Sequence, residues 1–137
     1  AARAAAALQA RAHRGRHGAA RCARLLDGLK AEGVATPLVL WALVSEIRAL
    51  ATLRAGLEQG EPLAALFKAE RIFERTRAQA IERALPRLMA GQLRAALMHA
   101  ARIDRMIKGL TQGDVWDEFL QLSLRLRNAN EKRTAKN

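Results

Sequence analysis

Apolar residues recur every three or four positions along most of the chain, which is the spacing of one face of an α-helix. No segment shows the two-residue alternation that is typical of a half-buried strand. Glycines that commonly follow a helical C-terminus, such as Gly33 and Gly60, divide the pattern into segments. The pattern therefore predicts an all-α fold, a compact bundle of about five to seven helices.

The first half of this bundle contains an Ala-rich helix ending near Gly15 or Gly18, a second ending near Gly33, and a well-defined third one. Thr36 is the expected N-cap of the third, with Pro37 at its first helical position. The apolar stripes consist of Cys22, Leu25, Leu26 and Leu29 in the second helix, and of Leu40, Leu43, Val44, Ile47, Leu50, Leu53 and Leu57 in the third. The remaining surface of the third is assigned to Ser45, Glu46, Arg48, Thr52 and Arg54.

Three further segments follow Gly60. Pro62 opens a short helix, a segment from about Arg71 to Leu85 comes next, and Pro86 marks its end. The expected apolar anchors are Leu63, Leu66 and Phe67 in the first, Phe73, Ile81 and Leu85 in the second, and Leu93, Leu97, Ala100, Ile103, Ile107 and Leu110 in the helix after Pro86.

The last helix follows the stretch TQGD, where Thr111 or Asp114 can act as the N-cap. Asp117 and Glu118 suit the positive end of its dipole. Its apolar residues cover more than one face: Val115, Trp116, Phe119, Leu120, Leu122, Leu124 and Leu126. Such a helix is either central to the bundle or binds a partner with its second face.

Composition adds a strong positive charge to this picture. The chain has 24 lysines and arginines against 13 acidic residues, a formal net charge of +11, which favours polyanions, acidic protein surfaces or anionic membranes. No apolar run is expected to span a membrane, which takes roughly 18 to 20 residues. Cys22 is the one cysteine, so an intramolecular disulfide is excluded and a reducing compartment fits best.

Candidate chemistry is sparse. The phosphate-binding pattern GxxxxGK[ST] is absent, and IKGLTQG has its residues in the wrong order. His13 and His17 are one helical turn apart, but no nearby Cys, Asp or Glu completes a metal site. The acidic group Asp114, Asp117 and Glu118 is explained by a helix start, and His99 is expected to be a packed or surface residue. We expect no catalytic residue, no cofactor and no metal.

Arginine arrays keep DNA contact open as a function. Such arrays can neutralise phosphates, although aromatic residues for base stacking are not interleaved with them, and a solvated basic surface is the alternative. The candidate contacts to a DNA backbone are Arg71, Arg75, Arg94, Arg102 and Arg105.

Three stretches carry a resemblance to a known family: LLDGLKAEGVATPLVLWALVSEIRALATLR, PLAALFKAERIFERTRAQAIERAL and ARIDRMIKGLTQGDVWDEFLQLSLRL. In this order they resemble the C-terminal domains of delta subunits of bacterial DNA polymerase III, which belong to the sliding-clamp loader. Phe73 stands where the family usually has Trp.

This resemblance implies a collar-type helical domain that assembles with the C-terminal domains of delta-prime and tau/gamma subunits in the bacterial cytoplasm, near the nucleoid. The parent subunit would belong to the DNA polymerase III holoenzyme without being its catalytic subunit. It would contact the beta clamp only through an N-terminal domain that this chain lacks. The alternative is an independent basic helical DNA-binding domain.

The expected domain organisation has three parts. Residues 1–18 are an Ala/Arg-rich helix or linker from a truncated parent chain, residues 19–127 the collar-like domain, and residues 128–137 a polar disordered tail. The candidate anchors of a subunit interface or of the core are Trp41, Glu46, Arg48, Trp116 and Phe119. A structural motif around the last turn consists of Ile103, Asp104, Lys108 and Gly109.

Overall fold

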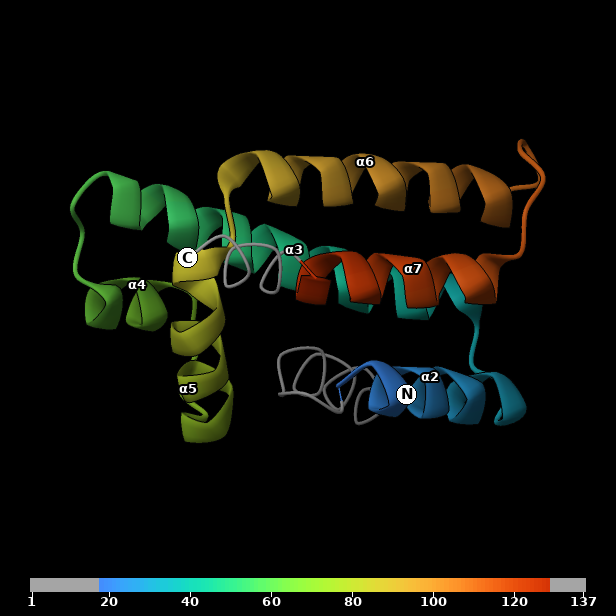
Figure 1. Cartoon of the computed structure of the whole chain (residues 1–137), viewed down its shortest axis with the longest axis horizontal. Coiled ribbons are helices and arrows are strands. Elements are labelled where there is room, and N and C mark those ends of the chain that lie inside the picture. Colours follow the sequence, from blue (N-terminus) through green and yellow to red (C-terminus); the bar gives the residue numbers. More distant parts are fainter. Residues whose placement is uncertain (1–17, 129–137) are drawn as a thin grey trace.

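A computed structural model describes residues 18–128, and this part of the chain contains six α-helices, one short 3₁₀ helix and no strand. The elements are α2 (Gly18–Ala31), α3 (Thr36–Glu58), α4 (Leu63–Ala69), α5 (Arg75–Ala84), η1 (Leu85–Arg87), α6 (Ala90–Ile107) and α7 (Val115–Asn128) (Figure 1). The all-α bundle is thus confirmed. The expected N-terminal helix or linker, the pair His13 and His17, and the tail beyond Asn128 lie outside the described residues.

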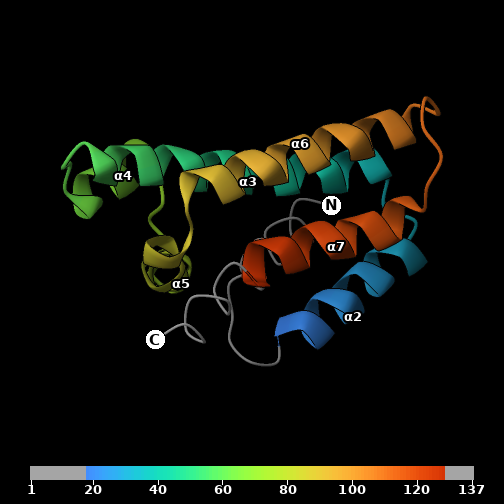
Figure 2. The same ribbon diagram turned by 45° about the horizontal axis from the view of Figure 1, so that its top comes forward.

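Four long helices form the body of the bundle. Helices α3 and α6 lie side by side and run in opposite directions, α7 packs against α6, and α2 packs against α7 (Figures 1 and 2). Helices α4 and α5 lie at the C-terminal end of α3. Each long helix therefore has a neighbour that buries its apolar stripe.

The core is centred on α3, whose stripe predicted from the sequence is the buried face. Leu43, Ile47, Leu50 and Leu53 are each at most 2% exposed. Each such side chain contributes roughly 1.5 to 3 kcal/mol by leaving water. The facing core residues include Leu93, Ala96, Ala100 and Ile103 of α6, and Phe119 and Leu122 of α7.

Helix α3 corrects the expectation about membrane spans. Its 23 residues are long and apolar enough to cross a membrane, by length and composition alone. The central helix of a bundle meets the same criterion because its buried stripe raises its hydropathy. Helix α3 occupies that central position, packed against α4, α6 and α7.

Helix α7 uses both of its apolar faces inside the bundle. It lies between α6 and α2 and also contacts α3 (Figure 2). Phe119 and Leu122 are fully buried, and Trp116 and Leu120 are half-buried against the same core. The broad apolar coverage of this helix therefore reflects a central position in the fold, which is the first of the two alternatives.

The ends of two helices have the same backbone geometry with different residues. After α6, Gly109 has a φ of 74°, its N–H donates to the Met106 carbonyl, and the Leu110 N–H donates to the Arg105 carbonyl. After α4, Arg71 takes the equivalent place with a φ of 56°. Both ends are Schellman motifs, which usually place glycine at this position.

Arg71 therefore belongs to the end of α4, and not to the following helix as expected from the sequence. Helix α5 begins only at Arg75. Phe73 lies in the connection and is 74% exposed, because Ile72 turns inward there instead and is 4% exposed. Leu110 is 72% exposed beyond the end of α6. Phe73 and Leu110 are thus wrong as core anchors, whereas Ile81 and Leu85 are buried as expected.

Replacing Arg71 with glycine is expected to raise the free energy of unfolding by about 0.5 to 1 kcal/mol. The left-handed conformation costs a residue with a Cβ about 1 to 2 kcal/mol. The greater freedom of glycine in the unfolded chain offsets up to about 1 kcal/mol of that gain. Urea unfolding measures the difference. The matched control is Gly109→Ala, which puts a Cβ into the same conformation and should lower stability by about 1 kcal/mol. A loss of stability in Arg71→Gly would contradict the strain at this position.

Candidate interaction surface on helices α3 and α6

A groove of about 390 Å³ runs along the surface between the antiparallel helices α3 and α6. Its lining comes from Pro37, Leu40, Trp41, Val44 and Arg48 on α3 and from Leu97, Ala100, Ala101 and Asp104 on α6. Seven of these nine residues are apolar. The groove is therefore an apolar depression with charged residues at its edges.

Trp41 dominates this surface. Trp41 is 63% exposed, although tryptophan is a large residue that is usually well buried. The helical repeat places it on the same side of α3 as Pro37, Val44 and Arg48, turned away from the buried Leu43 and its stripe. The interpretation of Trp41 as a core anchor is wrong, and the structure leaves it as a surface aromatic residue.

Alanines on α6 form part of the opposite wall. Ala100 is 3% exposed and Ala101 is exposed, and both line the groove beside Leu97. A larger side chain at either position would fill the depression. The groove is thus open because the α6 wall opposite Trp41 is formed in part by the small side chains of Ala100 and Ala101.

Two charged residues lie at the edges of the groove, Asp104 on α6 and Arg48 on α3. Asp104 and Lys108 form an ion pair at 2.8 Å within α6, as their spacing of one turn allows. Arg48 is exposed and has no acidic partner among residues 18–128. The charge of Asp104 is therefore balanced locally, whereas that of Arg48 faces solvent.

The candidate DNA contacts separate into two groups. Arg94, Arg102 and Arg105 are exposed on the outer face of α6, together with Met98, which is 69% exposed. Arg71 and Arg75 are exposed around the α4–α5 connection, outside this stripe. The fold thus brings three of the five arginines onto one surface stripe.

Glu46 is buried in the core, which corrects its assignment to the surface. Its side chain is 2% exposed and accepts a hydrogen bond from Nη2 of Arg77 at 2.8 Å, which ties α5 to α3. The sequence contained a signal for this burial, since Glu46 lies three residues after Leu43 and four before Leu50. A polar residue within an apolar stripe needs a buried partner.

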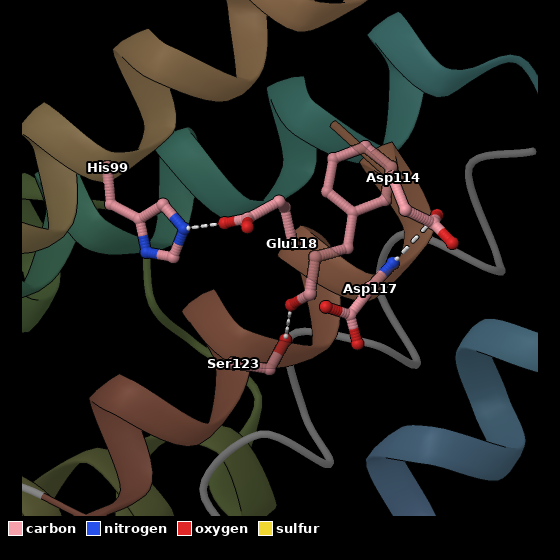
Figure 3. Close-up of polar contacts among 6 residues, drawn as sticks. His99, Asp114, Asp117, Glu118 and Ser123 are labelled. Carbon is pink, nitrogen blue, oxygen red and sulfur yellow. Dashed lines mark hydrogen bonds and ion pairs between the residues drawn. The ribbon is translucent and has the colours of Figure 1, made fainter. Parts of the chain in front are cut away.

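His99 and Glu118 form a second polar pair, which the sequence did not reveal. The His99 Nε2 atom lies 2.5 Å from the Glu118 carboxylate, and the imidazole is 4% exposed between α6 and α7 (Figure 3). Ser123, in the same view, donates its hydroxyl to the Phe119 carbonyl at 2.9 Å instead of to His99. The His99–Glu118 contact therefore joins α6 to α7, whereas the Ser123 hydrogen bond stays within α7.

The acidic residues around the start of α7 have structural partners. The Asp114 carboxylate accepts hydrogen bonds from the backbone N–H of Trp116 at 3.1 Å and from that of Asp117 at 3.2 Å, the second of which is drawn in Figure 3. Its role as the helix cap is confirmed. Within residues 18–128, no three His, Cys, Asp or Glu side chains lie close enough together to hold a metal ion.

The remaining sequence candidates lie inside the fold. Phe119 is 0% exposed, and its ring meets the half-buried Trp116 ring edge-on at 5.5 Å and 84°. Phe119 is therefore a core residue, and its interpretation as a subunit-interface anchor is wrong. Ile103 is also 0% exposed, so the motif of Ile103, Asp104, Lys108 and Gly109 consists of a core contact, an ion pair and a helix end.

No family model, no curated protein and no solved structure matches the chain.

Proposed function

We propose that this chain is a structural oligomerisation domain of the delta subunit of the bacterial DNA polymerase III clamp loader. In this role it helps to assemble the pentameric loader that places the sliding clamp on DNA, and its partners are the C-terminal domains of delta-prime and tau/gamma. The resemblance of three ordered stretches supports the family. The chain itself has no catalytic role in this proposal.

The exposure of Trp41 beside the α3–α6 groove is the observation that carries a protein-binding role. Trp41 is 63% exposed and Met98 is 69% exposed on neighbouring helices that are otherwise well packed. Exposed apolar patches with a polar rim mark interaction sites, and tryptophan is enriched among the residues that dominate binding energy.

Native mass spectrometry of the chain mixed with delta-prime and tau/gamma C-terminal domains tests this proposal. We expect a defined complex that persists from low to moderate salt. Trp41→Ala should weaken it at least about tenfold, or about 1.4 kcal/mol. The same change should move the free energy of unfolding by no more than about 0.5 kcal/mol, because Trp41 is mostly exposed.

Phe73→Ala is the matched control, since Phe73 is an aromatic residue outside the groove that is 74% exposed. It should leave the complex unchanged. The absence of any complex, or equal weakening by the two variants, would contradict an assembly role for this surface.

An independent DNA-binding role is the second candidate, and the arginine stripe of α6 favours it. Three exposed arginines, Arg94, Arg102 and Arg105, could contact successive phosphates. Binding to a duplex would then weaken steeply with salt, because each neutralised phosphate releases counterions. Salt-sensitive duplex binding in the absence of any protein complex would make this the better account.

A further inference from the structure

The chemistry of the α3–α6 groove restricts what it can bind. Small-molecule sites combine apolar walls with a few buried polar groups that fix the ligand's orientation. The charged residues in this lining, Arg48 and Asp104, lie at its exposed or half-exposed edges. The groove therefore suits an apolar surface that is presented by a larger molecule.

The length of the groove matches a short helix. Its lining on α3 extends from Pro37 to Arg48, which is about 17 Å, or three helical turns, at 1.5 Å per residue. A helix placed between two neighbouring helices buries side chains at successive turns, as in recognition of amphipathic helices by grooves. The walls that such a helix would meet are Leu40, Trp41, Val44 and Leu97.

The positive charges around the groove favour a bound helix whose polar side is acidic. Arg105 lies one turn after Ala101 on α6, and Arg94 lies one turn before Leu97, so both flank the α6 wall. Arg48 stands at the opposite wall. These arginines have no acidic partner among residues 18–128, whereas Asp104 is paired with Lys108.

We propose that the α3–α6 groove binds an acidic amphipathic helix of a partner protein. Apolar side chains of that helix pack on Leu40, Trp41 and Leu97, and its acidic residues face Arg48 on one side and Arg94 and Arg105 on the other. The inference rests on the proposed assembly function and specifies the chemistry of the partner. A basic helix is disfavoured because like charges across an interface repel each other, and an uncharged helix would gain no attraction from these arginines.

Synthetic helical peptides test this specificity with the complete 137-residue chain. One peptide has a leucine stripe flanked by glutamates, a second has the same stripe flanked by lysines, and a third has the glutamates with the leucines scrambled. Fluorescence anisotropy of labelled peptides measures binding. We expect the acidic amphipathic peptide to bind at least about tenfold more tightly than either of the others.

Two charge-reversal variants locate the site. Arg48→Glu should weaken binding of the acidic peptide at least about tenfold and improve binding of the lysine-flanked one. The matched control is Arg24→Glu, an exposed arginine on α2, which packs against α7 and does not line the groove. It should change either affinity by less than about twofold. Circular dichroism of both variants checks that the fold is retained.

Several results would overturn the inference. Equal binding of the scrambled peptide would show a purely electrostatic attraction, and equal effects of the two charge reversals would place the site elsewhere. Duplex DNA binding that depends on Arg48, without peptide binding, would assign the groove to nucleic acid. A dimer in light scattering that Trp41→Ala dissociates, again without peptide binding, would assign it to a second copy of the chain.

Different results would contradict the proposed delta-subunit function and the proposed specificity of the groove for an acidic helix. Binding of the acidic peptide without a clamp-loader complex would support the groove's specificity and contradict the delta-subunit assignment. A clamp-loader complex that Arg48→Glu leaves intact would support the assignment and overturn the groove as its contact.

Discussion

Replacing Phe119 with alanine is expected to lower the free energy of unfolding by about 3 to 5 kcal/mol. Phe119 is 0% exposed, and its ring lies in the core against Trp116. The change removes the transfer free energy of the ring and leaves a cavity between packed helices, which the surroundings fill only in part. Urea unfolding followed by far-ultraviolet circular dichroism measures this loss.

Phe73→Ala is the control for the Phe119 prediction, because it removes the same atoms from a residue that is 74% exposed. It should change stability by no more than about 0.5 kcal/mol. Similar losses of stability in the two variants would contradict the burial of Phe119 and the exposure of Phe73. The comparison also separates Phe119 from an interface role, since its substitution should affect partner binding only through unfolding.

Replacing Arg77 with methionine is expected to cost about 2 to 3 kcal/mol, somewhat below the roughly 3 to 5 kcal/mol for one partner of a fully buried pair. The Glu46 carboxylate would stay in a site where it is 2% exposed, without the guanidinium that now lies 2.8 Å away. The expected loss of stability is smaller than for a fully buried pair because the Arg77 side chain is 25% exposed, so water partly screens the pair. Chemical unfolding of the variant measures the loss.

A double-mutant cycle tests the cause of this loss. Glu46→Leu puts an apolar side chain into the buried position, and Arg77 can then turn to water, so this variant should lose less than Arg77→Met. The double variant should recover most of the stability. Lys108→Met, which breaks the exposed Asp104–Lys108 pair, should cost no more than about 0.5 kcal/mol. Equal losses in Arg77→Met and Lys108→Met would argue against a specific buried pair.

Acidic residues on the helices of this protein form ion pairs of two kinds, within one helix or between two helices. Asp104 forms an exposed ion pair one turn away on its own helix, which a pattern of charges predicts directly. Glu46 and Glu118 instead reach across to Arg77 and His99 on other helices. Contacts between helices depend on which faces meet, so no local pattern of the chain identifies these partners.

Most positions of the helices follow from local pattern, although the expected N-cap Thr36 is the first residue of α3 and Ala35 takes the cap position. Helix ends at Gly33, Gly60 and Gly109 have positive φ angles that a glycine adopts without strain, and Asp114 caps α7 through hydrogen bonds to residues two and three positions away. Arg71 shows the limit of this reasoning, because a helix ends there in the same geometry without a glycine to mark it.

The roles of the apolar residues depended on tertiary structure. The helical repeat places Trp41 beside Arg48 and off the Leu43 stripe, but it does not say whether another helix covers that side of α3. The apolar residues of α7 cover more than one face, so the repeat does not say how deeply Phe119 is buried. Phe119 is buried because α7 lies between α6 and α2, whereas Trp41 faces the side of α3 that no other described helix covers. Helical periodicity is a property of a few consecutive residues, so the chain alone predicts the helices. The choice between core and binding surface is made only when those helices pack.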